Sequence, residues 1–385
     1  MRPRFTAPNE GIPMLDDECV RKDCANLARS VRSVLLPVVL WLAVTPQARA
    51  QDAKLPPISV GAGVQTSFAH TSPDGGDSTD AFPLNSVRLY VSGSAATKVK
   101  FMFNTEYDGK SDHLSVLDAA AQFEMSDQFN IWVGQLIAPS DRANLYGPYY
   151  SNQWAPYNDS VQDNYPSVGL PGCCTGRDRG VLYWGQFDKV KVSGGVFDGA
   201  SLDGNNKVLT AGRVQVDFWD PEGGYYLNGT YYGAKDLLAV GIAGETQKSG
   251  SDWNSAWSAD FLLEKKVPGG GAFTVESEYA KYSNLGGIYA PYAENQGGYG
   301  LASFLFPPAA GMTGKFQVLG KFAKSNFSKG LAAINRDYSQ KTTEVNFNYI
   351  IKDFNARIMI FYRDQRFDAV RTNTKQFGVG VQLQM

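Results

Sequence analysis

The chain has 385 residues, of which 43% are hydrophobic, 13% aromatic and 19% charged. Its mean hydropathy of -0.27 excludes a polytopic helical membrane protein, because such proteins need repeated apolar runs of about 18 residues or more. The 36 Lys and Arg residues nearly balance the 38 Asp and Glu residues, so no basic field favours nucleic acid as a partner. The 22 Phe and 20 Tyr residues argue against bulk disorder.

Residues 1–50 are predicted to be a leader. A short apolar run, residues 34–44, follows Arg29 and Arg32 and precedes a small-x-small site that ends at Ala50. A basic region, an apolar core and such a site are typical of a secretory signal peptide, with cleavage after Ala50. A short buried helix is the alternative. On the first interpretation, residues 51–385 form the mature protein as a single domain.

Few residues of the mature chain suit catalysis or metal binding. Cys173 and Cys174 are adjacent, so they form either a strained vicinal disulfide or a pair of free thiols. Two thiols are too few for a Cys-based structural zinc site. The two histidines, His70 and His113, fall in predicted loops. We therefore expect no metal, no cofactor and no enzymatic activity.

Alternating apolar and polar residues recur along most of the mature chain, and no 3.6-residue stripe competes with them. The pattern is clear in residues 58–68, 99–107, 257–263 and 345–351. In residues 377–385, apolar side chains alternate with Gly and Gln to the last position. Successive side chains of a strand point to opposite faces, so each segment predicts a β-strand with one apolar and one polar face.

Such strands fit a soluble β-sandwich, but three features favour a membrane barrel. The polar faces carry charges, and each would cost several kcal/mol inside a sandwich unless paired, whereas a wet lumen removes that cost. Aromatic residues near strand ends suit the interfacial girdles of a membrane barrel. These residues are Tyr107, Phe129, Phe187, Trp219, Phe354, Tyr362 and Phe377.

The third feature is the alternation of tight and long connections, which matches short periplasmic turns and long extracellular loops. The tight turns are predicted at 96–98, 126–128, 187–189 and 352–354, and the long loops at 70–84, 139–178 and 325–340.

The strand count must be even if both termini lie on one side of the membrane. Counting every apolar stretch gives an odd number, about 17, and residues 225–232 lack clean alternation. We assign them to a longer periplasmic connection. The sequence therefore predicts an all-β fold, a transmembrane antiparallel β-barrel of about 16 strands around an aqueous channel.

The longest connection, residues 139–178, lies between the fifth and sixth predicted strands. Loops of this length are usually functional or disordered, and its aromatic residues argue against disorder. It either folds inward and narrows the pore or packs over the rim. The candidate constriction residues are Asp141, Arg142, Tyr146, Trp154, Arg177 and Arg179.

A narrowed pore selects by its diameter and by rings of charge. Charged residues on the polar strand faces are therefore candidates for the pore lining. Their mixed sign predicts no decisive ion preference. They are Arg88, Lys100, Glu106, Asp118, Lys191, Arg213, Asp217, Lys321, Arg357 and Arg363.

Three parts of the chain resemble one known family. They are Phe129-Asn-Ile-Trp-Val-Gly-Gln-Leu-Ile-Ala-Pro139, Arg179-Gly-Val-Leu-Tyr-Trp-Gly185 with Gly195-Val-Phe-Asp-Gly199, and the alternating C-terminal strand. Together they are similar to the phosphate-selective porin O and P family of Gram-negative outer membranes. The resemblance implies a 16-stranded homotrimeric channel for passive uptake of small, often anionic solutes, with inward loops and an arginine-lined path.

Two departures from the family bear on this expectation. Acids outnumber arginines in the long loop, which weakens the case for phosphate selectivity. The last residue is Met385, where such barrels typically end in Phe, although Met keeps the apolar character expected for insertion by the barrel-assembly machinery. We predict an outer-membrane porin that contacts outer-membrane lipid and lipopolysaccharide. An outer-membrane enzyme or an adhesin-like structural barrel is the alternative.

Overall fold

The computed structural model describes residues 57–109, 112–162, 176–199, 207–249, 252–283, 294–328, 337–368 and 371–385. The chain divides into two compact units, Met1–Leu55 and Pro56–Met385, and every described residue belongs to the second. The predicted leader and the Cys173-Cys174 pair lie outside the described residues, so both remain predictions.

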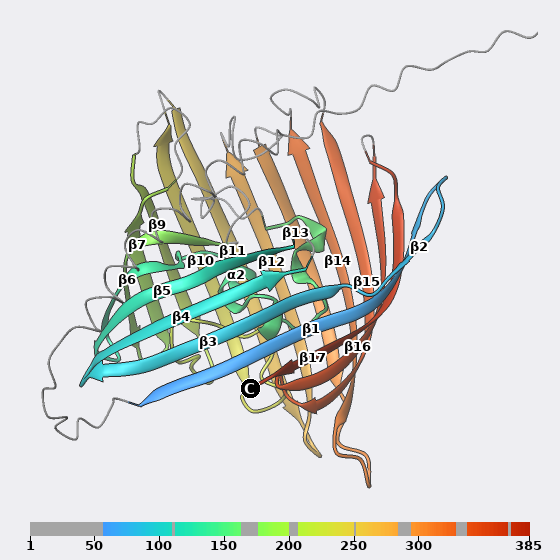
Figure 1. Ribbon diagram of the computed structural model, residues 1–385, viewed down its shortest axis with the longest axis horizontal. Coiled ribbons are helices and arrows are strands. Elements are labelled where there is room, and N and C mark those ends of the chain that lie inside the picture. Colours follow the sequence, from blue (N-terminus) through green and yellow to red (C-terminus); the bar gives the residue numbers. More distant parts are fainter. Residues whose placement is uncertain are drawn as a thin grey trace, which may run out of the picture. The chain divides into compact units, whose positions relative to one another are not determined.

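Seventeen strands form one sheet in the described part of the chain (Figure 1). One of them, β2, has only three residues and pairs with β1. The strands are β1 (Ile58–Pro73), β2 (Thr79–Ala81), β3 (Leu84–Ala96), β4 (Val99–Asp108), β5 (His113–Ser126), β6 (Phe129–Ile137), β7 (Arg177–Phe187), β8 (Val190–Phe197), β9 (Leu209–Asp217), β10 (Leu237–Ser249), β11 (Asp252–Val267), β12 (Gly271–Ser283), β13 (Glu294–Leu305), β14 (Lys315–Ser328), β15 (Tyr338–Lys352), β16 (Ala356–Phe367) and β17 (Thr374–Gln384).

The sheet closes on itself because β1 pairs with both β3 and β17. Gly63 is opposite Arg88 of β3 on one side and Gln384 of β17 on the other. The remaining long strands pair antiparallel with their neighbours in the chain, through to β16 with β17. In Figure 1, β1, β3 and β4 cross in front of the opposite wall, as the tilted strands of a barrel do. With β2 set aside, sixteen strands form a closed antiparallel barrel, which confirms the predicted fold class.

The two faces of each strand have opposite character. On β15, Val345 and Phe347 are each 50% exposed, whereas the alternate residues Glu344, Asn346 and Asn348 are buried. A half-buried soluble sheet shows the reverse, with its apolar face covered. The apolar side chains therefore form the outer surface of the barrel, and the polar side chains face its interior. No helix among the described residues is long and apolar enough to cross a membrane.

Short turns join the strands at one end of the barrel, which we call the short-turn end. Asp188 and Asp353 lie in two of these turns and have positive φ values of 55° and 43°. Tight hairpin turns need this left-handed backbone to match the strand twist, and Asp tolerates it better than most residues. All four predicted tight turns are confirmed, at Thr97-Lys98, Asp127-Gln128, Asp188-Lys189 and Asp353–Asn355.

The predicted long loops need two corrections of extent. β1 continues to Pro73, so the first loop is shorter than residues 70–84 and itself contains β2. β14 ends at Ser328 and β15 begins at Tyr338, so the loop predicted at 325–340 is shortened at both ends. The extra residues of β1 are polar or Pro and carry no apolar signal, whereas those of β14 and β15 include Phe327 and Tyr338, whose rings stack with centroids 4.5 Å apart.

Residues 218–236 connect β9 to β10 at the short-turn end, which confirms their assignment as a connection. This connection turns into the barrel, because Tyr225, Leu227 and Tyr232 are at most 5% exposed. The aromatic-girdle prediction is wrong for Phe354. Its ring is 8% exposed and packs 4.9 Å from Tyr232, so the ring turns inward onto the connection and cannot meet lipid.

Candidate functional site

Residues 138–162 leave β6 and cross the barrel interior, which confirms the inward-folding loop (Figure 1). The segment contains helix α2 (Arg142–Tyr146) and the short 3-10 helices η1 (Pro148–Tyr150) and η2 (Pro156–Asp159). Asp141 caps α2 by accepting a hydrogen bond from the Asn144 backbone nitrogen at 2.8 Å. All five residues of α2 are buried. We call residues 138–162 the inner loop.

Cations on the barrel wall fasten the backbone of the inner loop. Arg357 on β16 donates to the Ser151 carbonyl at 2.5 Å and the Tyr149 carbonyl at 3.2 Å. Arg363 on the same strand donates to the Trp154 carbonyl at 2.9 Å. Buried carbonyls that lack water need such partners. These arginines therefore hold the loop against the wall.

Acidic and other polar side chains of the wall also bind the inner loop. Tyr146 donates to Glu276 on β12 at 2.8 Å. Asn152 donates to Ser303 on β13 at 2.9 Å. Further contacts come from the Lys321–Asp159 ion pair, from Ser325 and from Gln340. The half of the lumen that faces β9 to β17 is therefore covered by the loop.

Two wall glycines make room for aromatic rings of the inner loop. A Cβ atom at Gly380 on β17 would lie 2.7 Å from the Trp154 ring, and one at Gly63 on β1 would lie 2.6 Å from the Tyr149 ring. Real Cβ contacts are longer than these distances, so any side chain at either position would displace the ring. Trp154 also stacks on Phe361, with ring centroids 6.2 Å apart and planes at 11°.

The 218–236 connection meets the inner loop inside the barrel. Tyr225 donates to the Ile137 carbonyl at 2.8 Å, and the Gly229 backbone nitrogen donates to the Tyr150 carbonyl at 2.9 Å. Glu222 pairs with Arg142, and both side chains are fully buried. Sequence alternation missed Glu222 because it lies in a connection and on no strand face.

A buried charge cluster surrounds this contact. Arg213 on β9 binds Asp260 on β11 through two hydrogen bonds of 2.5 and 2.8 Å, and Arg142 lies 3.6 Å from the same carboxylate. Burial by itself would raise the pKa of Glu222, but the adjacent Arg142 charge outweighs burial and lowers it. Burial raises the pKa of Asp141 to about 6.

The wall formed by β3 to β7 is less completely covered. Glu106 accepts a hydrogen bond from Arg88 at 2.9 Å, and its side chain is 18% exposed. Lys100 pairs with Glu124, and their side chains are 49% and 23% exposed. By contrast, Arg363 on the opposite wall is 2% exposed. Water therefore reaches the charged pairs of this wall better than those beneath the inner loop.

The predicted site residues fall into separate groups. Asp118 pairs with Arg177 at 3.0 Å on the less covered wall, together with Arg88, Lys100 and Glu106. Arg179 lies on the outer face, because it alternates with inward-facing Asp178, and it pairs with Asp198 at 2.9 Å. Arg88 and Asp118 are nevertheless buried, as are the remaining candidates in the interior: Asp141, Arg142, Tyr146, Trp154, Lys191, Arg213, Asp217, Lys321, Arg357 and Arg363.

A cavity of about 670 Å³ opens at the short-turn end, along the inward faces of β3 to β7. The 218–236 connection closes one side of it with Gly224, Tyr225 and Tyr226. We call this cavity the vestibule. It lies beside the Lys100–Glu124 pair of the β3–β5 wall, because Glu124 is among its lining residues.

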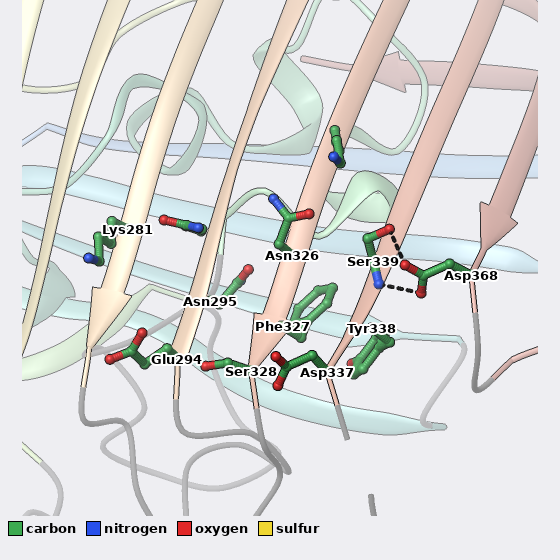
Figure 2. Close-up of a pocket in the computed structure, with 12 residues that line it drawn as sticks. Lys281, Glu294, Asn295, Asn326, Phe327, Ser328, Asp337, Tyr338, Ser339 and Asp368 are labelled. Atoms are coloured by element: carbon green, nitrogen blue, oxygen red, sulfur yellow. Dashed lines mark hydrogen bonds between the residues drawn. The ribbon is translucent and has the colours of Figure 1, made fainter. Parts of the chain in front are cut away.

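A second hollow, of about 370 Å³, lies at the long-loop ends of β12 to β16 (Figure 2). Figure 2 shows Ser339 beside Asp368, to which it donates from its backbone nitrogen at 2.6 Å and its hydroxyl at 2.7 Å. On the outer face here, Lys324 is directly opposite Lys341, which is directly opposite Arg366. Like charges in such positions destabilise a ladder unless an anion compensates them, and Arg366 has such a partner in Asp364 at 2.8 Å.

Comparison with known proteins supports the fold. No family model matches the chain, and no curated protein matches it either. Among solved structures, Salmonella typhi OmpF in complex with daunomycin matches with a TM-score of 0.59 and 12% identity over 86% of this chain and 98% of that chain. An anion-selective porin from Comamonas acidovorans matches with a TM-score of 0.52 and 13% identity over 86% and 100%.

A third match is the trimer form of OmpT, an outer membrane protein of Vibrio cholerae, with a TM-score of 0.50 and 12% identity over 85% of this chain and 99% of that chain. These likenesses establish a porin-like sixteen-stranded barrel. Since no family model matches the chain, its resemblance to the phosphate-selective porin O and P family stays a prediction.

Proposed function

We propose that this barrel is a passive diffusion channel for small hydrophilic solutes and ions, with its aqueous route along the β3–β7 wall. One observation carries the proposal. The inner loop covers the β9–β17 half of the lumen, while the charged pairs on β3 to β5 stay partly exposed beside the vestibule. Polar walls let a solute keep or exchange its hydration shell, so it crosses down its gradient with no bond chemistry.

The charge pattern of this wall supports weak ion selectivity. Arg88, Lys100 and Arg177 each face a carboxylate, on Glu106, Glu124 and Asp118 respectively. Paired charges present little net field to a passing ion, whereas a phosphate filter needs unpaired donors. The buried arginines beneath the loop bind protein carbonyls and carboxylates instead. We therefore propose a general channel and no strong anion or phosphate preference.

Single-channel recording tests this function. Purified folded protein is added to a planar lipid bilayer, and current is recorded in symmetric KCl and then in a tenfold salt gradient. We expect an ohmic current and a reversal potential near zero. Folded protein that carries no current would overturn the channel, and a large anion-selective potential that phosphate blocks would overturn the weak selectivity.

The channel's setting is part of the same proposal. We infer insertion by the barrel-assembly machinery into the outer membrane of a Gram-negative bacterium, after cleavage behind Ala50, and assembly as a homotrimer. The exposed apolar belt supports contact with lipid, and the row Lys324, Lys341 and Arg366 supports contact with phosphate groups of lipopolysaccharide. Mass spectrometry of the purified protein would give the N-terminal residue, and cross-linking in membranes would give the subunit number. A mature N-terminus other than Gln51, or a monomer, would contradict these two points.

A further inference from the structure

We propose that the vestibule is a binding site for neutral sugars, in which a pyranose ring rests on the aromatic side chains at the short-turn end. This inference rests on the proposed channel function and names a solute class for it. The cavity volume of about 670 Å³ falls within the usual range for small-molecule sites, about 300–1,000 Å³. What the cavity would take depends on its lining.

Five aromatic side chains line the vestibule: Tyr90, Trp132, Trp184, Tyr225 and Tyr226. Trp132 contacts Trp184 edge to face at 5.9 Å, Tyr225 at 5.4 Å and Tyr226 at 5.8 Å, measured between ring centroids. Because the rings support one another, their positions are fixed before any solute arrives. Aromatic faces carry negative charge density and attract the weakly positive C–H face of a sugar ring, as they attract the edges of other rings.

Hydrogen-bonding groups in the same cavity lack strong partners. Gln122 directs its amide nitrogen at the sulfur of Met102, 3.6 Å away, and the Tyr226 hydroxyl points at the same sulfur from 3.7 Å. A thioether is a weak acceptor, so an oxygen would be a better partner for both donors. The indole nitrogens of Trp132 and Trp184 are buried with no partner among the described residues.

Buried polar groups are normally satisfied, and unsatisfied ones call for a partner. A solute with several hydroxyl groups on a compact ring supplies that partner, because each hydroxyl both donates and accepts. The lining thus combines apolar faces with neutral donors, which is the chemistry that recognises a carbohydrate.

The charges of the vestibule argue for a neutral solute. The acids that line it are Glu124 and Asp127, no Lys or Arg is among its lining residues, and Lys100 is bound to Glu124. An anion such as phosphate would meet negative charge with no free cation to bind. A simple aromatic solute would use the rings but would leave the amide and hydroxyl donors unpaired, at a cost of about 1–3 kcal/mol each.

The test measures block of single-channel current by maltotriose, inorganic phosphate and benzyl alcohol, each added on either side of the bilayer. We expect maltotriose to reduce the current with a millimolar half-blocking concentration and the other two to have at least tenfold weaker effects. Gln122→Leu and Tyr226→Phe should each raise the half-blocking concentration of maltotriose about fivefold or more. Tyr279→Phe also loses one hydroxyl but lies on the outer face, so it serves as the matched control. Its half-blocking concentration of maltotriose should equal that of the parent protein.

The outcomes separate this inference from the channel function. An ohmic current that maltotriose does not block would overturn the sugar site and leave the channel standing. Stronger block by phosphate or by benzyl alcohol would overturn the solute class. Absence of any current from protein that still shows the heat-dependent gel mobility of a folded barrel would overturn the channel itself.

Discussion

Arg142 and Glu222 join two segments that enter the barrel from opposite ends. Arg142 lies on the inner loop and Glu222 on the 218–236 connection, and the guanidinium donates to the carboxylate through two nitrogens, one of them at 3.0 Å. Glu222 also accepts hydrogen bonds from Gln215 at 2.7 Å and Tyr231 at 2.8 Å. The pair therefore fixes how far each segment reaches into the lumen, and with it the width left beside the β3–β7 wall.

Glu222→Gln should destabilise the barrel, because it leaves the Arg142 charge buried with only Asp260 beside it. Loss of one partner from a buried ion pair costs roughly 3–5 kcal/mol in the free energy of unfolding. Urea unfolding in detergent micelles measures this cost. The double variant Arg142→Met with Glu222→Leu removes both charges and should recover most of the loss. A single variant as stable as the parent would show that the pair does not hold the two segments.

The stability of the protein should depend on the protonation of Asp141. Burial raises its pKa in the folded protein from an ordinary value of 3.8 to about 6, so the folded state favours the neutral acid. The resulting stability is fully present below about pH 4 and is lost as the pH rises through about 6. Asp141→Asn keeps a side chain that can cap α2 and should flatten this dependence. Unfolding midpoints between pH 4 and pH 7.5 provide the comparison, and identical slopes for the two proteins would refute it.

Breaking the Arg88–Glu106 pair should tilt the ion preference of the channel. Glu106→Gln leaves the positive charge of Arg88 without its carboxylate, so the reversal potential in a salt gradient should move toward anion preference. Arg88→Gln leaves the carboxylate and should move it toward cation preference. Both shifts should shrink at high salt because exposed charges are screened. Arg366→Gln, on the outer face, is the control, and equal potentials in all variants would place the route elsewhere.

Gly380→Leu should move the inner loop, because a side chain there would occupy the place of the Trp154 ring. The displaced loop should alter the single-channel conductance by a factor of about two or more and lower the free energy of unfolding by about 1–3 kcal/mol. Gly320→Leu is a matched control, since the same substitution on the outer face of β14 meets no atom within 4 Å. A Gly380→Leu channel with the parent's conductance would argue that the loop does not set the width.

Much of the barrel could be predicted from the sequence because alternation is a local signal. Val345 and Asn346 point to opposite faces wherever the strand lies, so their order alone separates the lipid side from the lumen side. The tight turns at Asp188 and Asp353 were equally readable from polar residues between two alternating runs. The presence of the inner loop after β6 was visible for the same reason, as a long stretch without alternation.

The candidate site was less predictable, since strand alternation tells only which wall residues face inward. It placed Lys100 and Arg357 in one class, but the inner loop buries Arg357, whereas the Lys100 side chain is 49% exposed. Glu222 carried no periodic signal at all, and its role depends on Arg142, which is 80 residues away in the chain. Phe354 was assigned to the lipid boundary because its position beside a turn does not reveal that Tyr232 packs against it.

A barrel with an apolar exterior, a polar interior and one long loop can be predicted from the order of neighbouring residues, because each of these features is a local pattern. Which part of the interior stays open depends instead on how the folded segments pack together. That outcome depends on contacts between segments far apart in the chain, such as Arg142 with Glu222 and Gly380 with Trp154. Such contacts form when the barrel closes and brings opposite walls within reach, and no local pattern records them.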